Sequence, residues 1–194
     1  AILKKRQIKE GLMQQLLTPG HTNCKWVEKT GRELFSIGNG RDYKGLGKGN
    51  IPVYGTGGII AYVDEFLHEG PTVCIGRKGT IDKPQYHDGK IWTVDTLFYT
   101  FNFCGVIPKF LYYIFERVNW HALNEATGVP SLTSKNILNV SFLIPEDEVE
   151  QESIVSILDA VESEILNLQN KRDKYASIKQ GMMQELLTGK TRLI

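Results

Sequence analysis

The fold is decided by one stretch near the C-terminal end, residues 146–187, which reads EDEVEQESIVSILDAVESEILNLQNKRDKYASIKQGMMQELL. It contains no proline and a single glycine, Gly181, and Pro145 stands directly before it. Acidic residues fill its first turns, where the helix dipole favours negative charge, and bases follow in its later part. The stretch therefore predicts one helix of about 42 residues, roughly 60 Å long at 1.5 Å per residue.

Apolar residues recur in this helix at alternating spacings of four and three, the seam by which one helix packs lengthwise on another. A globular domain of this size does not need so long a helix for its own core, so part of the helix is expected to serve another surface. The sequence therefore predicts a coiled coil. Its seam consists of Ile154, Leu158, Val161, Ile165 and Leu168.

The chain also contains an internal repeat. Residues 8–18 read IKEGLMQQLLT and residues 178–188 read IKQGMMQELLT, so eight of eleven positions are identical. A glycine at the same place in both copies argues against coincidence between two helices rich in Leu, Gln and Lys. The chain opens with a copy of the end of its own closing helix, which is typical of one period of a two-period protein.

Charge is sorted along the chain, although the net charge is only +1. Residues 145–170 carry eight acids and no base, whereas residues 1–20 carry four bases and one acid. We therefore expect residues 1–17 to pack antiparallel on residues 145–168, with apolar contacts supplying stability and charge choosing the orientation. The expected contacts join Ile8, Leu12 and Leu16 to Ile154, Leu158, Val161 and Ile165.

That arrangement leaves the basic end of the long helix, residues 171–188, without a partner helix. Its apolar stripe consists of Ile178, Met182 and Leu186. Because an exposed apolar stripe on a soluble protein usually finds a partner, the sequence predicts a homodimer through the long helices. The alternative is a monomer whose distal helix is covered only in a larger complex.

The residues between the helices have a different character, with frequent glycines and short β-prone runs. Strands are expected at Thr72–Ile75, Ile91–Thr93, Leu97–Phe103 and Ser141–Ile144, and a helix at Lys109–Trp120. The predicted fold class is α+β: a mixed-sheet globular domain flanked by a short N-terminal helix and a long C-terminal coiled-coil helix. The expected bounds are 1–20, 21–144 and 145–194.

Four loops interrupt these elements: GNGRDYKGLGKGN at 38–50, YGTGG at 54–58, GRKGT at 76–80 and ATGVPSLTSKN at 126–136. Each combines glycine with Thr, Ser, Lys or Arg. Glycine lets a backbone approach a ligand closely, and these side chains can donate to phosphates or base edges. Taken alone, such a loop is more often a solvated turn than a binding site.

These residues resemble the specificity subunit of type I restriction–modification systems. The closing helix, from Pro145 through Glu150 and Gln151 to the ending IKQGMMQELLTGKTRL, is similar to the conserved spacer of that family. The loops YGTGG, IGRKG and ATGVPSLTSKN, with the following FLIP run, resemble its target recognition domain. Full subunits carry two recognition domains and two spacers. This chain is therefore either the second half of a longer subunit or a natural half-subunit.

The resemblance implies a protein without a catalytic centre, which places methyltransferase and restriction subunits on a bipartite double-stranded DNA site. S-adenosylmethionine, ATP and Mg²⁺ are then expected on the partner subunits, and no cofactor or metal on this chain. The residues agree: there is no Pro-Pro pair of an adenine methyltransferase, and Asp82-Lys83 lacks the Glu-x-Lys strand of a nuclease. GLGKG at 45–49 lacks the Gly-Lys-Ser/Thr ending of a phosphate loop.

In this family context, ten loop residues are candidate DNA contacts. The bases of the first loop are expected to contact phosphates from a flexible segment. The two bases between Gly76 and Gly79 are expected to present a fork to guanine O6 and N7. The tyrosine of YGTGG is left open between a place beside the groove and a place in the core. The set is Arg41, Lys44, Lys48, Tyr54, Thr56, Arg77, Lys78, Ser131, Thr133 and Lys135.

Two other classes of function remain open from the sequence. A coiled-coil interaction adaptor would not bind DNA in a salt-sensitive way, and a stand-alone enzyme such as a nuclease would act without a partner. Three widely separated cysteines and the lack of any apolar run near the roughly 18 residues of a membrane span favour a cytoplasmic protein with reduced thiols.

Overall fold

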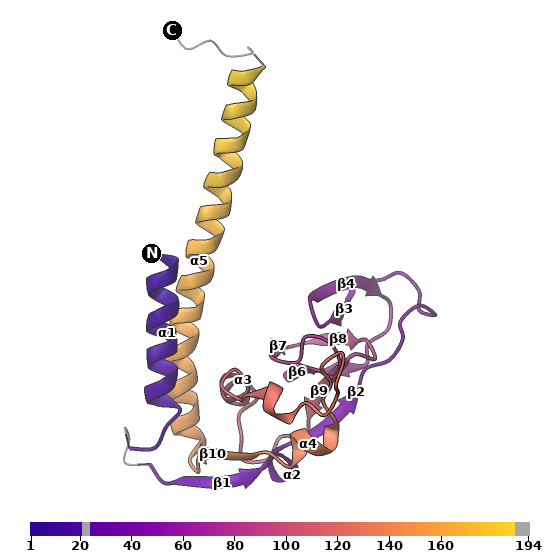
Figure 1. The fold of residues 1–194 in the computed structure, drawn as a ribbon, viewed down its shortest axis with the longest axis vertical. Coiled ribbons are helices and arrows are strands. Elements are labelled where there is room, and N and C mark those ends of the chain that lie inside the picture. Colours follow the sequence, from indigo (N-terminus) through magenta and orange to yellow (C-terminus); the bar gives the residue numbers. More distant parts are fainter. Residues whose placement is uncertain (21–23, 189–194) are drawn as a thin grey trace. The chain divides into compact units, whose positions relative to one another are not determined.

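The computed structural model describes residues 1–20 and 24–188 (Figure 1). The chain forms two compact units. One combines Ala1–Leu16 with the chain from Ser156 onward, and the other is Leu17–Val155. The predicted α+β class, with mixed sheets and a long closing helix, is confirmed. No helix within the described residues is long and apolar enough to cross a bilayer.

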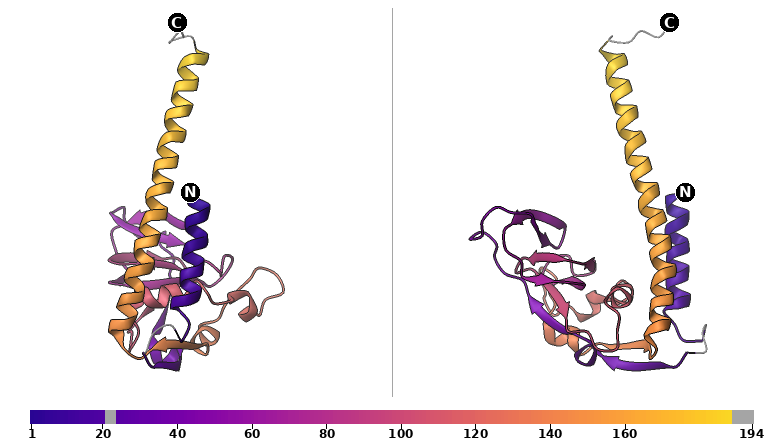
Figure 2. Two further views of the ribbon diagram at one scale, coloured as in Figure 1. Left: turned by 90° about the vertical axis from the view of Figure 1, so that its left-hand side faces the viewer. Right: turned by 180° about the vertical axis from the view of Figure 1, so that it is seen from behind.

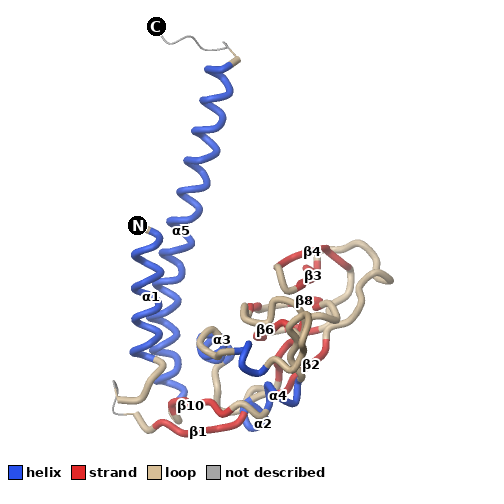
Figure 3. The backbone as a smooth tube through the Cα atoms, viewed as in Figure 1, coloured by secondary structure: helices blue, strands red, loops and turns tan. Residues whose placement is uncertain are grey.

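The helical unit contains α1 (Ile2–Leu16) and most of α5 (Glu148–Leu187). Figures 2 and 3 show α1 beside the first half of α5 and running in the opposite direction. Lys5 lies 2.6 Å from Glu164, and Lys9 lies 3.5 Å from Glu162. The partners recede along α5 as the lysines advance along α1, so the two helices are antiparallel.

The seam of α5 faces α1 as its spacing predicts. Leu158 is fully buried and Ile165 is 8% exposed, while Val161 and Leu168 are half-buried. Ile154 is also buried, but it lies in the other unit.

The contact face of α1 differs from the one expected. Leu12 and Leu16 are half-buried and Met13 is buried, but Ile8 is 39% exposed, so its predicted contact is wrong. At 3.6 residues per turn, Ile8 points about a quarter turn away from the face that these residues share. Lys9 lies on that face instead, because its aliphatic stem can pack there while its ammonium group reaches Glu162.

Beyond residue 170, every described residue of α5 is exposed. The side chain of Met182 is 59% exposed, and those of Ile178 and Leu186 are 46% and 40% exposed. The last residues of the predicted spacer, 189–194, lie outside the described part of the chain. The distal helix therefore carries the uncovered apolar stripe that the sequence predicts.

The second unit holds three sheets. The first pairs two antiparallel strands, β1 (Trp26–Thr30) and β10 (Ser141–Pro145). The second is antiparallel, in the order β2 (Ser36–Asn39), β9 (Leu97–Phe101), β6 (Thr72–Gly76) and β7 (Gln85–His87). The third is mixed, because β3 (Ile51–Gly55) runs antiparallel to β4 (Gly58–Val63) and parallel to β8 (Lys90–Thr93); β5 (His68–Glu69) completes it.

Short helices cover the sheets: α2 (Gly31–Leu34), α3 (Pro108–Phe115), the 3₁₀ turn η1 (Trp120–Leu123) and α4 (Ser134–Leu138). The predicted helix at Lys109–Trp120 is wrong at its end, because α3 stops at Phe115. The carbonyl of Phe115 accepts from the Trp120 indole at 2.9 Å and from the Val118 amide at 3.3 Å. These bonds replace the one that would continue the helix.

Aromatic packing forms the core beside α3. The ring of Phe115 contacts Trp120 edge-on at 4.9 Å and stacks on Phe142 at 5.8 Å. Phe35 contacts Phe115 edge-on at 5.6 Å. All four side chains are buried, so this cluster ties β10 to α3 and η1.

The first turn of α5 is fixed to this unit by Gln151, which is fully buried. Its side-chain oxygen accepts from the Ile107 amide at 2.8 Å, and its amide nitrogen donates to the carbonyls of Gly105 and Pro145. A buried polar group must be paired in this way. Gln151 of the spacer motif therefore has a structural role at the start of the helix.

Candidate DNA interface

An open pocket of about 350 Å³ brings two of the predicted loops together. Four of the ten candidate DNA contacts line it. They come as two pairs, one from each loop, and the pairs lie more than fifty positions apart in the sequence. The lining carries two positive charges and no acid. Its residues are Asn39, Arg77, Lys78, Phe98, Ser131, Leu132, Thr133 and Ser134.

Backbone hydrogen bonds hold the two loops against each other. Lys78 and Ser131 form an antiparallel bridge. The Leu132 amide donates to the carbonyl of Arg77 at 2.9 Å, and the Gly79 amide donates to the carbonyl of Pro130 at 2.9 Å. The two loops therefore act as one surface with a fixed backbone.

Arg77 is the best-positioned base in this pocket. Its amide donates to the carbonyl of Thr96 at 2.8 Å, so its backbone is fixed on both sides. Its guanidinium carbon lies 5.8 Å from the centre of the buried Phe98 ring, while the side chain remains exposed. Gly76, just before it, is required, because a Cβ there would lie 2.0 Å from the Thr80 carbonyl oxygen.

The polar side chains of the second loop are partly committed to the fold. The hydroxyl of Thr133 accepts from the Asn136 amide at 3.2 Å and caps α4. The Ser131 amide donates to the side chain of Asn124 at 2.9 Å, and Ser131 is half-buried. Lys135 is exposed on α4 but does not line the pocket. The predicted loop 126–136 ends in a helix, because Ser134 already begins α4.

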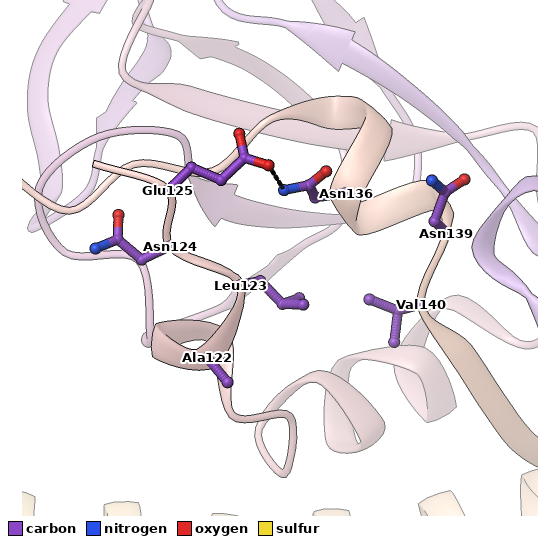
Figure 4. A pocket seen from close by; sticks show the side chains of 7 residues that line it. All are labelled: Ala122, Leu123, Asn124, Glu125, Asn136, Asn139 and Val140. Carbon is purple, nitrogen blue, oxygen red and sulfur yellow. Dashed lines mark hydrogen bonds between the residues drawn. The ribbon is translucent and has the colours of Figure 1, made fainter. Parts of the chain in front are cut away.

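A second pocket, of about 360 Å³, is lined by residues 122–125 from η1 and the segment after it, and by Asn136, Asn139 and Val140 from α4 and the segment after it (Figure 4). Asn136 donates to Glu125 at 2.7 Å, and Asn139 accepts from Arg32 at 3.1 Å. Asn124 holds the backbone of Ala126 through both atoms of its amide. Each of these asparagines therefore uses at least one atom of its side-chain amide within the fold.

The first loop, 38–50, is anchored at several of its residues. The carbonyl of Arg41 accepts from the Trp92 indole at 2.9 Å, and the Arg41 amide donates to Thr93 at 2.8 Å. Tyr43 and Leu46 pack on the core around Trp92. The side chains of Arg41, Lys44 and Lys48 are exposed, so they project from a fixed backbone.

The YGTGG segment forms the turn of the β3–β4 hairpin. Tyr54 is half-buried, and its ring stacks on that of His87 at 3.7 Å. Burial raises the pKa of Tyr54 and lowers the pKa of His87 to about 4, so His87 is neutral near pH 7. Gln85 donates to the carbonyls of Gly55 and Thr56 at 3.0 and 3.2 Å.

Several residues of the site were missed in the sequence. Asn39 lies inside the first loop motif, but its place beside Phe98 depends on the pairing of β2 with β9. His87 and Gln85 give no sequence signal, because their contacts with the hairpin cross between sheets. Within the described residues, no three His, Cys, Asp or Glu side chains gather in a group that could hold a metal ion.

The family model of the type I restriction modification DNA specificity domain matches residues 23–178. A protein of Haemophilus influenzae described as a type I restriction enzyme specificity subunit is 30% identical over 117 residues, which are 58% of this chain and 30% of that protein.

Solved structures share the fold. The type I restriction–modification S subunit from M. genitalium aligns with a TM-score of 0.78 and 16% identity, over 95% of this chain and 54% of that one. The HsdS subunit from Thermoanaerobacter tengcongensis aligns with a TM-score of 0.63 and 16% identity, over 95% and 52%. The chain thus spans about half the length of these structures and a smaller part of the H. influenzae relative. Because the family model covers most of its residues, the chain belongs to the type I restriction modification DNA specificity domain family.

Proposed function

We propose that this chain reads DNA as a type I specificity subunit, or as half of one, and directs methyltransferase and restriction subunits to a bipartite DNA site. The observation that carries the proposal is the pocket around Arg77. There, two Gly-containing loops join their backbones and present two basic side chains and three hydroxyl groups without an acid. Membership of the family supports the same function.

The candidate contacts divide into two roles. Arg77 has a fixed backbone and a planar fork, which suits the O6 and N7 atoms of guanine. Arg41, Lys44 and Lys48 lie on another loop and offer charge without a shaped pocket, which suits phosphates. The Tyr54 ring stacks on His87 and so supports the hairpin, while its contact with DNA remains a proposal.

The chemistry of restriction and methylation belongs to other subunits in this proposal. One solved structure with this fold, at 17% identity, is described as concerning complex assembly of the type I system, which supports partnership with such subunits. S-adenosylmethionine, ATP and Mg²⁺ would be held by those partners in the cytoplasm. The purified chain should methylate and cleave no DNA by itself.

One experiment separates this function from an interaction adaptor. Binding to a random-sequence duplex is measured at 50 and 200 mM salt, with and without the methyltransferase subunit from the same locus. Each phosphate neutralised lowers the slope of log K against log salt by about 0.9, so three contacts give a slope near −2.7. DNA affinity without salt dependence, or no DNA affinity in either state, would favour the adaptor and contradict the proposal.

The distal half of α5 is proposed to be the assembly surface. The internal repeat places Lys179, Met182 and Leu186 at the positions of Lys9, Leu12 and Leu16, which face the acidic half of α5. The distal face therefore suits an acidic helix with an apolar seam. If the chain is a half-subunit, a second copy brings the two long helices together as a homodimer.

Sedimentation at micromolar concentration tests this assembly. The dimer proposal expects a mass of about twice 21.9 kDa and a monomer for Met182→Glu, because a charge on the stripe opposes burial. A monomer that Met182→Glu leaves unchanged would contradict the dimer and favour a distal helix that only the full complex covers.

A further inference from the structure

We propose that Asn39 reads a base edge beside Arg77, so that the pocket recognises two neighbouring purines, adenine through Asn39 and guanine through Arg77. The inference rests on the proposed DNA-reading function and deepens it. It adds a specificity-determining residue that is not among the ten candidate contacts.

The sheet brings the two residues to opposite sides of one ring. In the order β2-β9-β6, Asn39 on β2 is paired with Phe98 on β9, and Ile75 on β6 is paired with Phe98 from the other side. Arg77 follows directly after β6. Asn39 and Arg77 therefore flank Phe98, and all three line the same pocket.

The backbone of Asn39 is held as firmly as that of Arg77. A Cβ at Gly38 would lie 2.1 Å from the Tyr99 ring, and one at Gly40 would lie 2.0 Å from the Val94 carbonyl oxygen. The Gly40 amide donates to the carbonyl of Leu97 at 3.1 Å. Close packing on both sides fixes the direction in which the Asn39 side chain leaves the strand, which is the preorganisation that base reading requires.

The polar atoms of Asn39 are available for a ligand. Its side chain is exposed, and its side-chain amide makes no hydrogen bond within the described residues. The Arg77 side chain is also exposed, and its guanidinium makes no hydrogen bond there either. Asn124, Asn136 and Asn139, in contrast, each use their amides inside the fold. The pocket thus combines an uncommitted amide with an uncommitted guanidinium.

The chemistry of these groups defines the bases they fit. An asparagine amide forms two hydrogen bonds with N6 and N7 of adenine, and an arginine fork forms two with O6 and N7 of guanine. Asn39 and Arg77 leave the sheet about 10 Å apart, because β9 lies between β2 and β6. The long Arg77 side chain reaches over the Phe98 ring of β9, so its guanidinium and the Asn39 amide can meet bases that are stacked about 3.4 Å apart. Lys78 adds a positive charge to the lining, which favours approach of the phosphate backbone.

The test selects binding sites with the complex of the chain and the methyltransferase subunit from the same locus. The probe is a pool of duplexes with a randomised central segment. We expect the wild-type complex to select a motif in which guanine and adenine are neighbours. Asn39→Ala should lose the adenine preference by about 5- to 150-fold and keep the guanine, whereas Arg77→Ala should do the reverse.

Two further variants separate reading from folding. Asn39→Asp keeps the shape but exchanges the donor for an acceptor, so the preference should move from adenine towards cytosine. Asn50→Ala removes an exposed asparagine outside the pocket and should leave the motif unchanged. The asparagine variants should unfold at the wild-type temperature, because neither asparagine makes a side-chain hydrogen bond in the described fold.

The outcomes are distinct. A wild-type complex that selects no motif would overturn the proposed function together with this inference. A wild-type motif that Asn39→Ala retains at full strength would overturn the inference alone. Equal weakening of every sequence by Asn39→Ala would also overturn it, since that is the behaviour of a phosphate contact.

Discussion

Residues 8–18 and 178–188 carry nearly the same sequence in two different surroundings. In α1 the motif lies against the acidic half of α5, and Met13 is 8% exposed. In the distal half of α5 the equivalent Met183 is 51% exposed, and the residues around it are also exposed. An acidic helix with an apolar seam covers the first copy, and no described residue covers the second. A nearly identical helix face is therefore buried or exposed according to the helix beside it.

The largest expected effect comes from the seam that covers the first copy. Leu158→Ala should lower the free energy of unfolding by about 2–5 kcal/mol, because it leaves a cavity at a fully buried position. Leu166→Ala is the matched control, since that leucine is 56% exposed on the same helix. Urea unfolding measures both. Equal losses for the two variants would show that α1 does not cover the seam.

A second, smaller effect compares the two copies directly. Met13→Ala should cost about 2 kcal/mol of unfolding free energy, at the low end for a buried methionine. Met183→Ala should change it by less than about 0.5 kcal/mol in the free chain, because its side chain is exposed. If the two substitutions lower the free energy of unfolding equally in a monomeric sample, the contrast between the two copies is wrong.

The smallest effect concerns the charges that set the antiparallel orientation of α1 on α5. Lys9→Ala removes an ion pair with Glu162 in which the lysine side chain is 15% exposed, and should cost up to about 1 kcal/mol. Lys179→Ala, at the equivalent position of the distal copy, should cost nothing measurable in the free chain. Thermal unfolding at low and high salt measures the difference. A loss that salt does not reduce would show that packing of the lysine stem matters more than its charge.

The sequence predicts the helices better than the sheets, for a physical reason. The seam of α5 repeats every few residues, so local spacing alone gives its length and its buried face. The same reasoning is wrong for Ile8, because the helical repeat drifts and Lys9 can occupy an apolar face through its stem. Strands β6, β8, β9 and β10 were predicted from their β-branched and aromatic residues. Strands β3 and β4 are not predicted, because the glycines of 54–58 indicate only the loop between them.

The candidate site is less predictable because it depends on contacts between distant segments. The sequence indicates both the loop that contains Arg77 and the loop that contains Ser131. Their contact depends on the backbone bridge between Lys78 and Ser131, which no local pattern indicates. The first loop looked flexible, since its anchors, such as the Trp92 indole, come from another strand. Asn39 was missed because only its register with Phe98 places it beside Arg77.

The most direct test measures whether the Arg77 guanidinium contacts bases or phosphates. The complex with the methyltransferase subunit is titrated with the duplex that the wild-type complex selects and with a random duplex. Arg77→Ala should weaken binding to the selected duplex by about 1–3 kcal/mol and barely change binding to the random one. Lys48→Ala should weaken both alike and flatten the salt dependence. An Arg77→Ala complex with undiminished preference for the selected duplex would contradict base reading in this pocket.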